Sequence, residues 1–254
     1  MVGAYTAFFV LTAMGAGPWG MILAFVLSML ICAIFGVTIE RLAYRPLRSA
    51  PRLNSLITAI AVSLILVNGV RVVPFIGPNP RRFPRPEVFN IAITEELAIT
   101  NVQLVVIVLS ALLMIVLNYI VNYTKRGKAM RAVSFDRQAA SLMGISVNRI
   151  ITFTFALGSA LAAAGGVLYA TAYPQIIPTM GMMPGLKAFV AAVLGGIGSV
   201  PGAMLGGYIL GIVETITRGF ISSHFADAIT FSILIIVLLI KPTGILGKKT
   251  GVKV

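Results

Sequence analysis

Residues Thr124 to Ile150 read TKRGKAMRAVSFDRQAASLMGISVNRI and form the one long polar, strongly basic segment of the chain. Apolar runs at 102–123 and 150–173 flank it, and each is long enough to cross a bilayer. The segment carries a single acid, Asp136, against six basic residues: Lys125, Arg126, Lys128, Arg131, Arg137 and Arg149. A basic connection between two spans is typical of the cytoplasmic side of a membrane protein. We therefore expect segment 124–149 to be a cytoplasmic connection between two transmembrane helices.

The composition is that of a membrane protein. Hydrophobic residues make up 58% of the chain and charged residues 11%, whereas a soluble domain needs about 25% charged residues to cover its surface. The apolar runs are 4–15, 19–39, 53–70, 102–123, 150–173, 186–198, 202–217 and 226–240. They predict an all-α polytopic transmembrane helical bundle with about seven or eight membrane segments, some short or broken. Because the spans use most of the length, we expect a single membrane domain over residues 1–254.

The basic residues are concentrated in three connections. Segments 40–52, 124–149 and 241–254 hold fourteen of the twenty lysines and arginines. The positive-inside rule therefore places these three segments, including the C-terminus, in the cytoplasm and the proline-rich connection 71–101 outside. The membrane also explains the net charge of +13 better than nucleic acid does, because the charges lie between apolar runs rather than on a soluble face.

Segment 124–149 contains a short helix with clear ends. Asp136 can cap a helix over 137–143, and Gly144 stands where a left-handed helix end favours glycine. A small apolar face of this helix, made of Ala139, Ala140 and Met143, could fill a pocket in a partner protein. The alternative is a solvated basic loop that only obeys the positive-inside rule.

Several motifs resemble a known family. Gln138-Ala139-Ala140, followed after three residues by Gly144, resembles the Glu-Ala-Ala-x-x-x-Gly loop with which permease subunits of bacterial ABC importers engage their ATPases. Gln138 replaces the glutamate of that pattern, and its closing Ile-x-Leu-Pro is absent. Four other stretches resemble the LivH-type permease of branched-chain amino acid importers: Glu40–Arg48 (ERLAYRPLR), Gly181–Phe189 (GMMPGLKAF), Gly195–Ala203 (GGIGSVPGA) and Lys241–Gly247 (KPTGILG).

The resemblance implies a role and a set of partners. It implies a permease subunit in the bacterial inner membrane that carries leucine, isoleucine and valine and pairs with a second, LivM-like permease. Two cytoplasmic ABC ATPases and a periplasmic amino-acid-binding protein would complete the importer. The ATPase-coupling residues would be Arg131, Asp136, Gln138, Ala139, Ala140, Met143 and Gly144. Family members usually carry a further helix before the Gly3-Ala4-Tyr5 match, so either the start site was placed late or this member is trimmed.

Small residues suggest where helices pack closely. Gly158, Ala162 and Gly166 form one set spaced by four residues, and Gly198, Gly202 and Gly206 form another. Small residues at this spacing let helix backbones approach within a membrane. Candidates for the translocation path are Asn68, Asn118, Gly195, Gly196, Gly198 and Glu214. Because these groups are scattered, we expect substrate choice to reside mainly in the separate binding protein.

The chain lacks the residues of a catalytic or cofactor site. Its single histidine, His224, has no partner set, and its single cysteine, Cys32, lies in an apolar run. Glu214 and Arg218 are spaced to form an ion pair on one helix. The glycine-rich stretches 196–202 and 244–250 lack the spacing of nucleotide-binding motifs, so we expect no nucleotide site, metal or cofactor. The remaining rivals are a permease for another amino acid, amide or sugar, an ion-coupled secondary carrier and a membrane-embedded enzyme.

The orientation can be tested with cysteine labelling. Because segment 124–149 is basic, we expect a cysteine at Ser134 to be protected from a membrane-impermeant thiol reagent in intact cells and a cysteine at Asn90 to react. Reaction at Ser134 together with protection at Asn90 would reverse the proposed topology.

Overall fold

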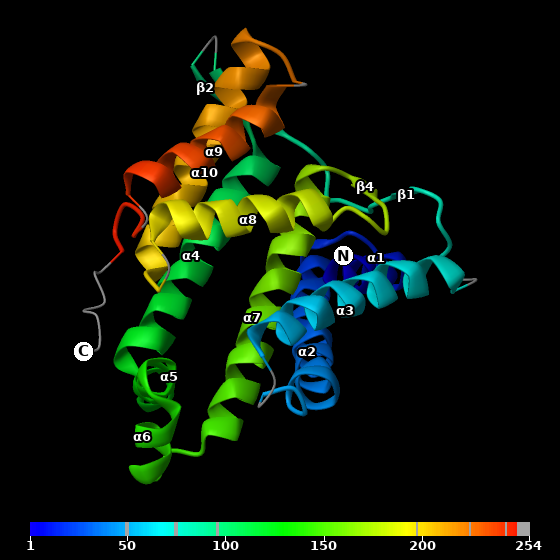
Figure 1. Cartoon of the computed structure of the whole chain (residues 1–254). Helices are drawn as coiled ribbons and strands as arrows, with labels where there is room; N and C mark the ends of the chain where they lie inside the picture. The colour runs from blue at the N-terminus through cyan, green and yellow to red at the C-terminus, as the bar shows by residue number, and fades with distance from the viewer. Residues whose placement is uncertain are drawn as a thin grey trace. The chain divides into compact units, whose positions relative to one another are not determined.

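The computed structural model describes residues 1–48, 51–73, 76–94, 97–196, 198–223, 225–241 and 243–247. Figure 1 shows that these residues are mostly helical, which confirms the predicted all-α class. The helices are α1 Val2–Met14, α2 Pro18–Ile39, the π-helix Glu40–Tyr44, α3 Arg52–Val72, α4 Asn101–Tyr123, α5 Lys125–Phe135, α6 Arg137–Leu142, α7 Val147–Ala172, α8 Met182–Gly195, α9 Val200–Phe220 and α10 Phe225–Ile240. The short strands are β1 Arg81–Arg82, β2 Asn90–Thr94, β3 Leu97–Thr100 and β4 Gln175–Ile176.

Eight apolar helices correspond to the eight predicted runs, and their ends differ from the prediction by at most four residues. Among the described residues, five stretches are long and apolar enough to cross a membrane: Pro18–Tyr44, Leu53–Val72, Asn101–Tyr123, Val147–Ala172 and Val200–Phe220. Helices α1, α8 and α10 are apolar but shorter. The helical bundle with some short segments is therefore confirmed.

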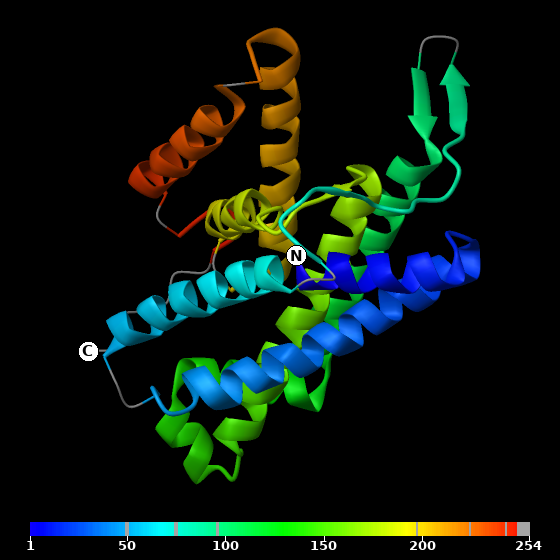
Figure 2. The same cartoon turned by 90° about the vertical axis from the view of Figure 1, so that its right-hand side faces the viewer.

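The first of two compact units comprises Met1–Leu113 and Tyr119–Met180. Helix α2 packs along α7, and α1 packs against both; the antiparallel α1 and α2 lie side by side in Figure 2. Buried Tyr5, Leu11 and Val167 form part of the core between these helices. Strands β1 and β4 pair antiparallel, with Arg81 opposite Ile176. Buried Ile176 of β4 and Phe83, the residue after β1, belong to the same core. In a membrane, van der Waals contact between these side chains stabilises the packing of the three helices.

The close approaches on α7 differ from the predicted seam. A Cβ atom added at Gly3 of α1 would lie 2.7 Å from the Cα of Ala163 on α7. A Cβ atom added at Gly36 of α2 would overlap the side chain of Ser159 on α7. A Cβ atom added at Gly158 would have no neighbour within 4 Å, and one added at Gly166 would have none nearer than 3.9 Å. The prediction that Gly158, Ala162 and Gly166 form the packing face was therefore wrong. The close contacts involve Ser159 and Ala163, each one residue further along α7. The physical reason is that α7 carries small residues on several faces, so more than one register satisfies the same spacing.

The second compact unit comprises Met114–Asn118 and the described residues from Gly181 onward. Helix α9 packs on both α8 and α10, around buried Val190, Ala191 and Leu210. Added Cβ atoms at Gly202 and Gly206 would overlap carbonyl oxygens of α8, which confirms close packing at these two predicted positions. Gly198 has nothing within 4 Å, so the third member of that set does not take part.

The end of α8 is completed by residues distant in sequence. The amide of Ile245 donates to the carbonyl of Leu194, and the amide of Leu246 donates to that of Gly195, each at 2.9 Å. These bonds satisfy two carbonyls that the helix leaves without intrahelical partners at its C-terminus. The Lys241–Gly247 motif thus has a structural function on α8, although Pro242 lies outside the described residues.

The connection 71–101 contains a β-hairpin that the sequence did not predict. Strands β2 and β3 pair antiparallel, with Asn90 opposite Thr100 and Thr94 opposite Leu97. The backbone amide of Thr100 donates to Oε1 of Gln103 at 3.1 Å, as part of a capping box that begins α4. The hairpin therefore leads directly into a membrane-spanning helix.

The α8–α9 contact yields a test with a matched control on the same helix. Gly206→Ala places a Cβ against the carbonyl oxygen of Ala191, whereas Gly211→Ala places it in open space. We expect the first change to destabilise the protein by about 1–3 kcal/mol through overpacking and the second to be neutral or stabilising, because alanine favours helix over glycine by about 1 kcal/mol. Thermal unfolding in detergent measures both. Equal melting temperatures for the two variants would refute the close contact.

Candidate functional site

The polar segment 124–149 folds into two short helices with side-chain caps. Oγ1 of Thr124 accepts from the amide of Gly127 at 3.0 Å and begins α5. Oδ1 of Asp136 accepts from the amides of Gln138 at 2.9 Å and Ala139 at 3.1 Å and begins α6. The predicted cap is confirmed, and the helix ends at Leu142, one residue before the predicted Met143.

The turn after α6 depends on Gly144. This glycine has φ of 79°, in the left-handed region that L side chains rarely adopt. The amide of Gly144 donates to the carbonyl of Ser141, and that of Ile145 donates to the carbonyl of Ala140, each at 3.0 Å. This is the helix ending predicted from the sequence, and it turns the chain directly from α6 into α7.

The exposed apolar face of α6 differs from the predicted one. Leu142 is 89% exposed and Met143 is 82% exposed, whereas Ala140 is only 5% exposed. Ala139 is exposed and Ala140 packs inside the chain, so Ala139, Ala140 and Met143 do not share one accessible face. Leu142 was not among the predicted residues, although a leucine in an otherwise polar segment was a usable signal. The large accessible apolar side chains at the end of α6 are Leu142 and the residue after the helix, Met143.

Helix α5 is anchored to its neighbours. Arg131 donates from Nη1 to Oδ1 of Asn122, at the end of α4, at 2.8 Å. The guanidinium of Arg126 lies 5.0 Å from the centre of the Phe153 ring of α7, within the range of a cation–π contact. Buried Gly127 lies against the backbone of α4. A displacement of α5 or α6 would therefore be transmitted to α4 and α7.

A buried carboxylate joins the end of α2 to the beginning of α7. Glu40 is fully buried and forms an ion pair with Arg48. Its other oxygen accepts from Oγ1 of Thr152 at 2.8 Å, and Arg48 also donates to the side chain of Asn148. Burying a charge is costly unless it is paired and hydrogen-bonded, and both carboxylate oxygens of Glu40 have such partners. This network fixes residues 40–48 to the first two turns of α7, immediately after α6.

The second unit holds a cluster of four charges. Nζ of Lys187 on α8 lies 2.7 Å from Oε1 of Glu214 on α9 and 2.8 Å from Oδ1 of Asp227 on α10. Arg218 also pairs with Glu214. The predicted Glu214–Arg218 pair is therefore confirmed, and Lys187 and Asp227 extend it. The two acids and two bases balance one another across three helices.

The comparison with known proteins identifies the family. Residues 1–240 match the family described as branched-chain amino acid transport system / permease component. The chain belongs to this family. It is therefore a multi-pass inner-membrane permease component rather than a catalytic subunit.

Named relatives of this permease family support the assignment. The chain is 41% identical to the high-affinity branched-chain amino acid transport system permease protein LivH of Escherichia coli (strain K12), with 100% of this chain and 85% of the relative covered. It is 40% identical, with the same coverage, to the permease protein BraD of Pseudomonas aeruginosa. The fructose import permease protein FrcC of Rhizobium meliloti is 30% identical over 42% of this chain and 31% of its own length. No solved structure matches the chain.

The path candidates predicted for this permease are divided between the two compact units. Asn68 belongs to the first unit, where its Nδ2 donates to the carbonyl of Leu64 at 2.9 Å. Asn118, Glu214 and the glycines at 195, 196 and 198 belong to the second. The glycines stand at the turn between α8 and α9, and Glu214 follows the first residue of α9 by fourteen residues, or about 21 Å along the helix. His224, considered as a catalytic candidate, lies outside the described residues.

The buried ion pair of this permease gives a sharp test. Arg48→Gln leaves the Glu40 carboxylate fully buried without its cation, which we expect to cost about 3 kcal/mol and to lower the melting temperature by about 6–12 °C. Arg85→Gln is the control, because it removes an exposed arginine that forms no ion pair among the described residues and lies outside this network. Thermal unfolding in detergent should separate the two variants. Equal melting temperatures would contradict a stabilising role of the pair.

Proposed function

We propose that this chain is the membrane-spanning permease subunit of an ATP-driven importer and forms part of the translocation path for leucine, isoleucine and valine. The family match and the named relatives, which are branched-chain amino acid permeases, support this cargo. The partners would be a second, LivM-like permease, two cytoplasmic ATPases and a periplasmic amino-acid-binding protein. The C-terminus would lie in the cytoplasm, together with segments 40–52 and 124–149, because these segments hold most of the basic residues.

The exposed tip of α6 carries the proposal that this subunit engages an ATPase. Leu142 and Met143 extend into solvent from a polar, basic segment that lies between two apolar spans. Large apolar side chains of this kind typically insert into a pocket of a partner. We assign the docking contact to these two residues and assign positioning of the tip to Asp136 and Gly144, whose cap and turn fix its ends.

The contacts of α5 and α6 suggest how force reaches the membrane. Closure of the ATPases would displace α6, and the displacement would pass through Ile145 into α7 and through Arg131 into α4. The Glu40 network would carry it on to α2. Packed helices that move together in this way can convert a small shift into a change of access. The candidates Arg131, Gln138, Ala139 and Ala140 then support the tip rather than contact the ATPase through a shared apolar face.

Two alternative functions have less support. An ion-coupled carrier needs ionisable groups that bind and release the driving ion, whereas the charges of Lys187, Glu214, Arg218 and Asp227 are mutually paired. A sugar or other small solute is the second alternative, since FrcC is a fructose import permease. The path candidates Asn68, Asn118, Gly195, Gly196, Gly198 and Glu214 are scattered along the sequence, which favours selection by the binding protein.

The function can be tested on the complex that copurifies with the tagged chain from its native host. In proteoliposomes with the binding protein, we expect ATP-dependent uptake of radiolabelled leucine and little uptake of fructose. Uptake of fructose without leucine would assign the chain to the sugar branch. Uptake driven by an ion gradient without ATP would instead identify a secondary carrier.

The same assay tests the docking tip. We expect Met143→Asp and Leu142→Asp to reduce ATP-dependent leucine uptake at least roughly ten-fold, because an aspartate in an apolar pocket costs more than about 1.4 kcal/mol. Gly144→Val should act in the same direction by straining the left-handed turn. Ser134→Asp is the control, since it adds the same charge to exposed α5 outside the tip. Wild-type ATP-dependent leucine uptake in both Met143→Asp and Leu142→Asp would show that the end of α6 does not dock on the ATPase.

A further inference from the structure

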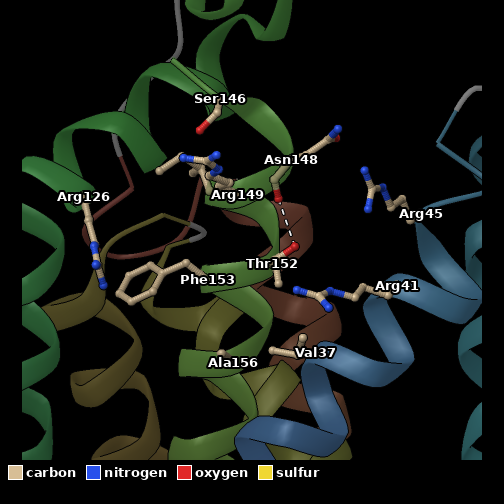
Figure 3. A pocket seen from close by; sticks show the side chains of 11 residues that line it. Val37, Arg41, Arg45, Arg126, Ser146, Asn148, Arg149, Thr152, Phe153 and Ala156 are labelled. Carbon is tan, nitrogen blue, oxygen red and sulfur yellow. Dashed lines mark hydrogen bonds between the residues drawn. The ribbon is translucent and has the colours of Figure 1, made fainter. Parts of the chain in front are cut away.

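An open cavity of about 890 Å³ lies within the first unit and is lined by four arginines. Arg41 and Arg45 come from the end of the Pro18–Tyr44 span, and Arg149 comes from the first turn of α7. Arg126 comes from α5, just after α4. We call this site the basic cavity. In Figure 3, Arg41 and Arg45 belong to the segment on one side of α7, and Arg126 belongs to the helix on its other side.

The charge of the basic cavity is uncompensated among the described residues. None of its four arginines forms an ion pair there, and no acid lines the cavity. Glu40 does not line the cavity but accepts a hydrogen bond from the lining residue Thr152. The Glu40 carboxylate is fully buried and already paired with Arg48. Four like charges around one cavity repel each other and concentrate a positive potential. An anion would relieve this repulsion.

The remaining polar lining also favours an anion. Ser146 precedes the first residue of α7, makes no side-chain cap bond and lines the cavity beside Asn148 and Thr152. The first amides of a helix have no intrahelical partners, and the helix dipole adds a partial positive charge. Together with the arginines, these groups match the oxygens of a phosphate, for which arginine provides a planar set of donors.

The apolar part of the cavity lining favours a lipid over a free anion. Val37 precedes Arg41 by one turn of α2, and Phe153 and Ala156 lie beyond Thr152 along α7, so the apolar lining lies toward the interior of the two spans. The arginines lie at the span ends, where lipid headgroups are found. A polar rim above an apolar floor fits an amphiphile, and basic pockets between membrane helices bind anionic headgroups.

We propose that the basic cavity binds the phosphate of an anionic phospholipid from the adjacent leaflet, with an acyl chain along Val37, Phe153 and Ala156. The guanidinium of Arg126, positioned on the Phe153 ring, bridges the headgroup region and the apolar floor. The cavity adjoins residues 146–152, which follow α6 directly, so a bound lipid contacts the same turns of α7 that hold Glu40. This inference depends on membrane insertion and not on the identity of the cargo.

The test measures lipid binding to the purified full-length chain in neutral detergent by native mass spectrometry and by thermal shift. We expect phosphatidylglycerol to bind and to raise the melting temperature, and phosphatidylcholine to do neither. The double variant Arg41→Gln/Arg149→Gln should weaken phosphatidylglycerol binding roughly ten-fold or more, since each basic residue near a membrane surface contributes measurably to anionic lipid affinity. The charge-preserving variant Arg41→Lys/Arg149→Lys should retain most of the affinity and shows that the fold is intact.

Three further results would each overturn the proposal in favour of a different explanation. Lys125→Gln/Lys128→Gln removes two charges from the same segment outside the cavity lining, so an equal loss of binding in this variant overturns the site in favour of general electrostatics. Glycerol phosphate or inorganic phosphate that stabilises the chain as strongly as phosphatidylglycerol overturns the lipid assignment in favour of a free anion. Loss of ATPase copurification in the arginine double variant, with lipid binding unchanged, overturns it in favour of a protein contact.

Discussion

The contact between Glu40, Arg48 and Thr152 determines the arrangement of the basic end of the first unit. A carboxylate that is wholly removed from solvent is tolerated only with its cation and hydrogen-bond donor in place. Its partners come from residue 48 and from α7, more than a hundred residues away, so one interaction fixes the end of a first span against the start of another. The proposed docking tip precedes these turns in the chain, and Thr152 both donates to Glu40 and lines the basic cavity.

Helix packing in this chain follows two different physical rules. Around Tyr5 and Val167, large apolar side chains and alanines form a buried core, and Gly3 and Gly36 let α1 and α2 approach α7 closely beside it. Between α8 and α9, glycines let the backbones approach and leave little side-chain volume between the helices. The second arrangement suits a membrane, where lipid removes the hydrophobic drive and contact itself must stabilise the pair. The Lys187 cluster then adds charge pairing to the same three helices without leaving a net charge.

Local features of the fold were predictable from sequence, whereas long-range pairings were not. Hydropathy identified the eight apolar helices found among the described residues, and the Asp136 cap and Gly144 turn followed from residue type at one position. The register of the α7 seam did not follow, because Ser159 and Ala163 satisfy the same spacing as Gly158 and Ala162. Thr152, which donates to Glu40, and the acids Glu214 and Asp227, which pair with Lys187, lie on other helices, and no spacing rule within one segment encodes these contacts. The orientation of Ala140 depended likewise on its packing inside the chain.

The surface of α3 has a consequence for how this sequence can vary. In its membrane-length stretch, Leu53–Val72, no residue is buried inside the chain, and large apolar side chains such as Leu56, Ile60 and Leu64 are exposed. Lipid or a neighbouring subunit must therefore supply the contacts of this helix. A fluid lipid surface accepts leucine, isoleucine, valine and phenylalanine almost interchangeably, whereas a subunit interface tolerates fewer of them. A comprehensive substitution scan of α3 would thus report on its surroundings: a uniform tolerance for apolar residues marks a lipid-facing helix, and a stripe of intolerant positions outlines the footprint of a neighbouring protein.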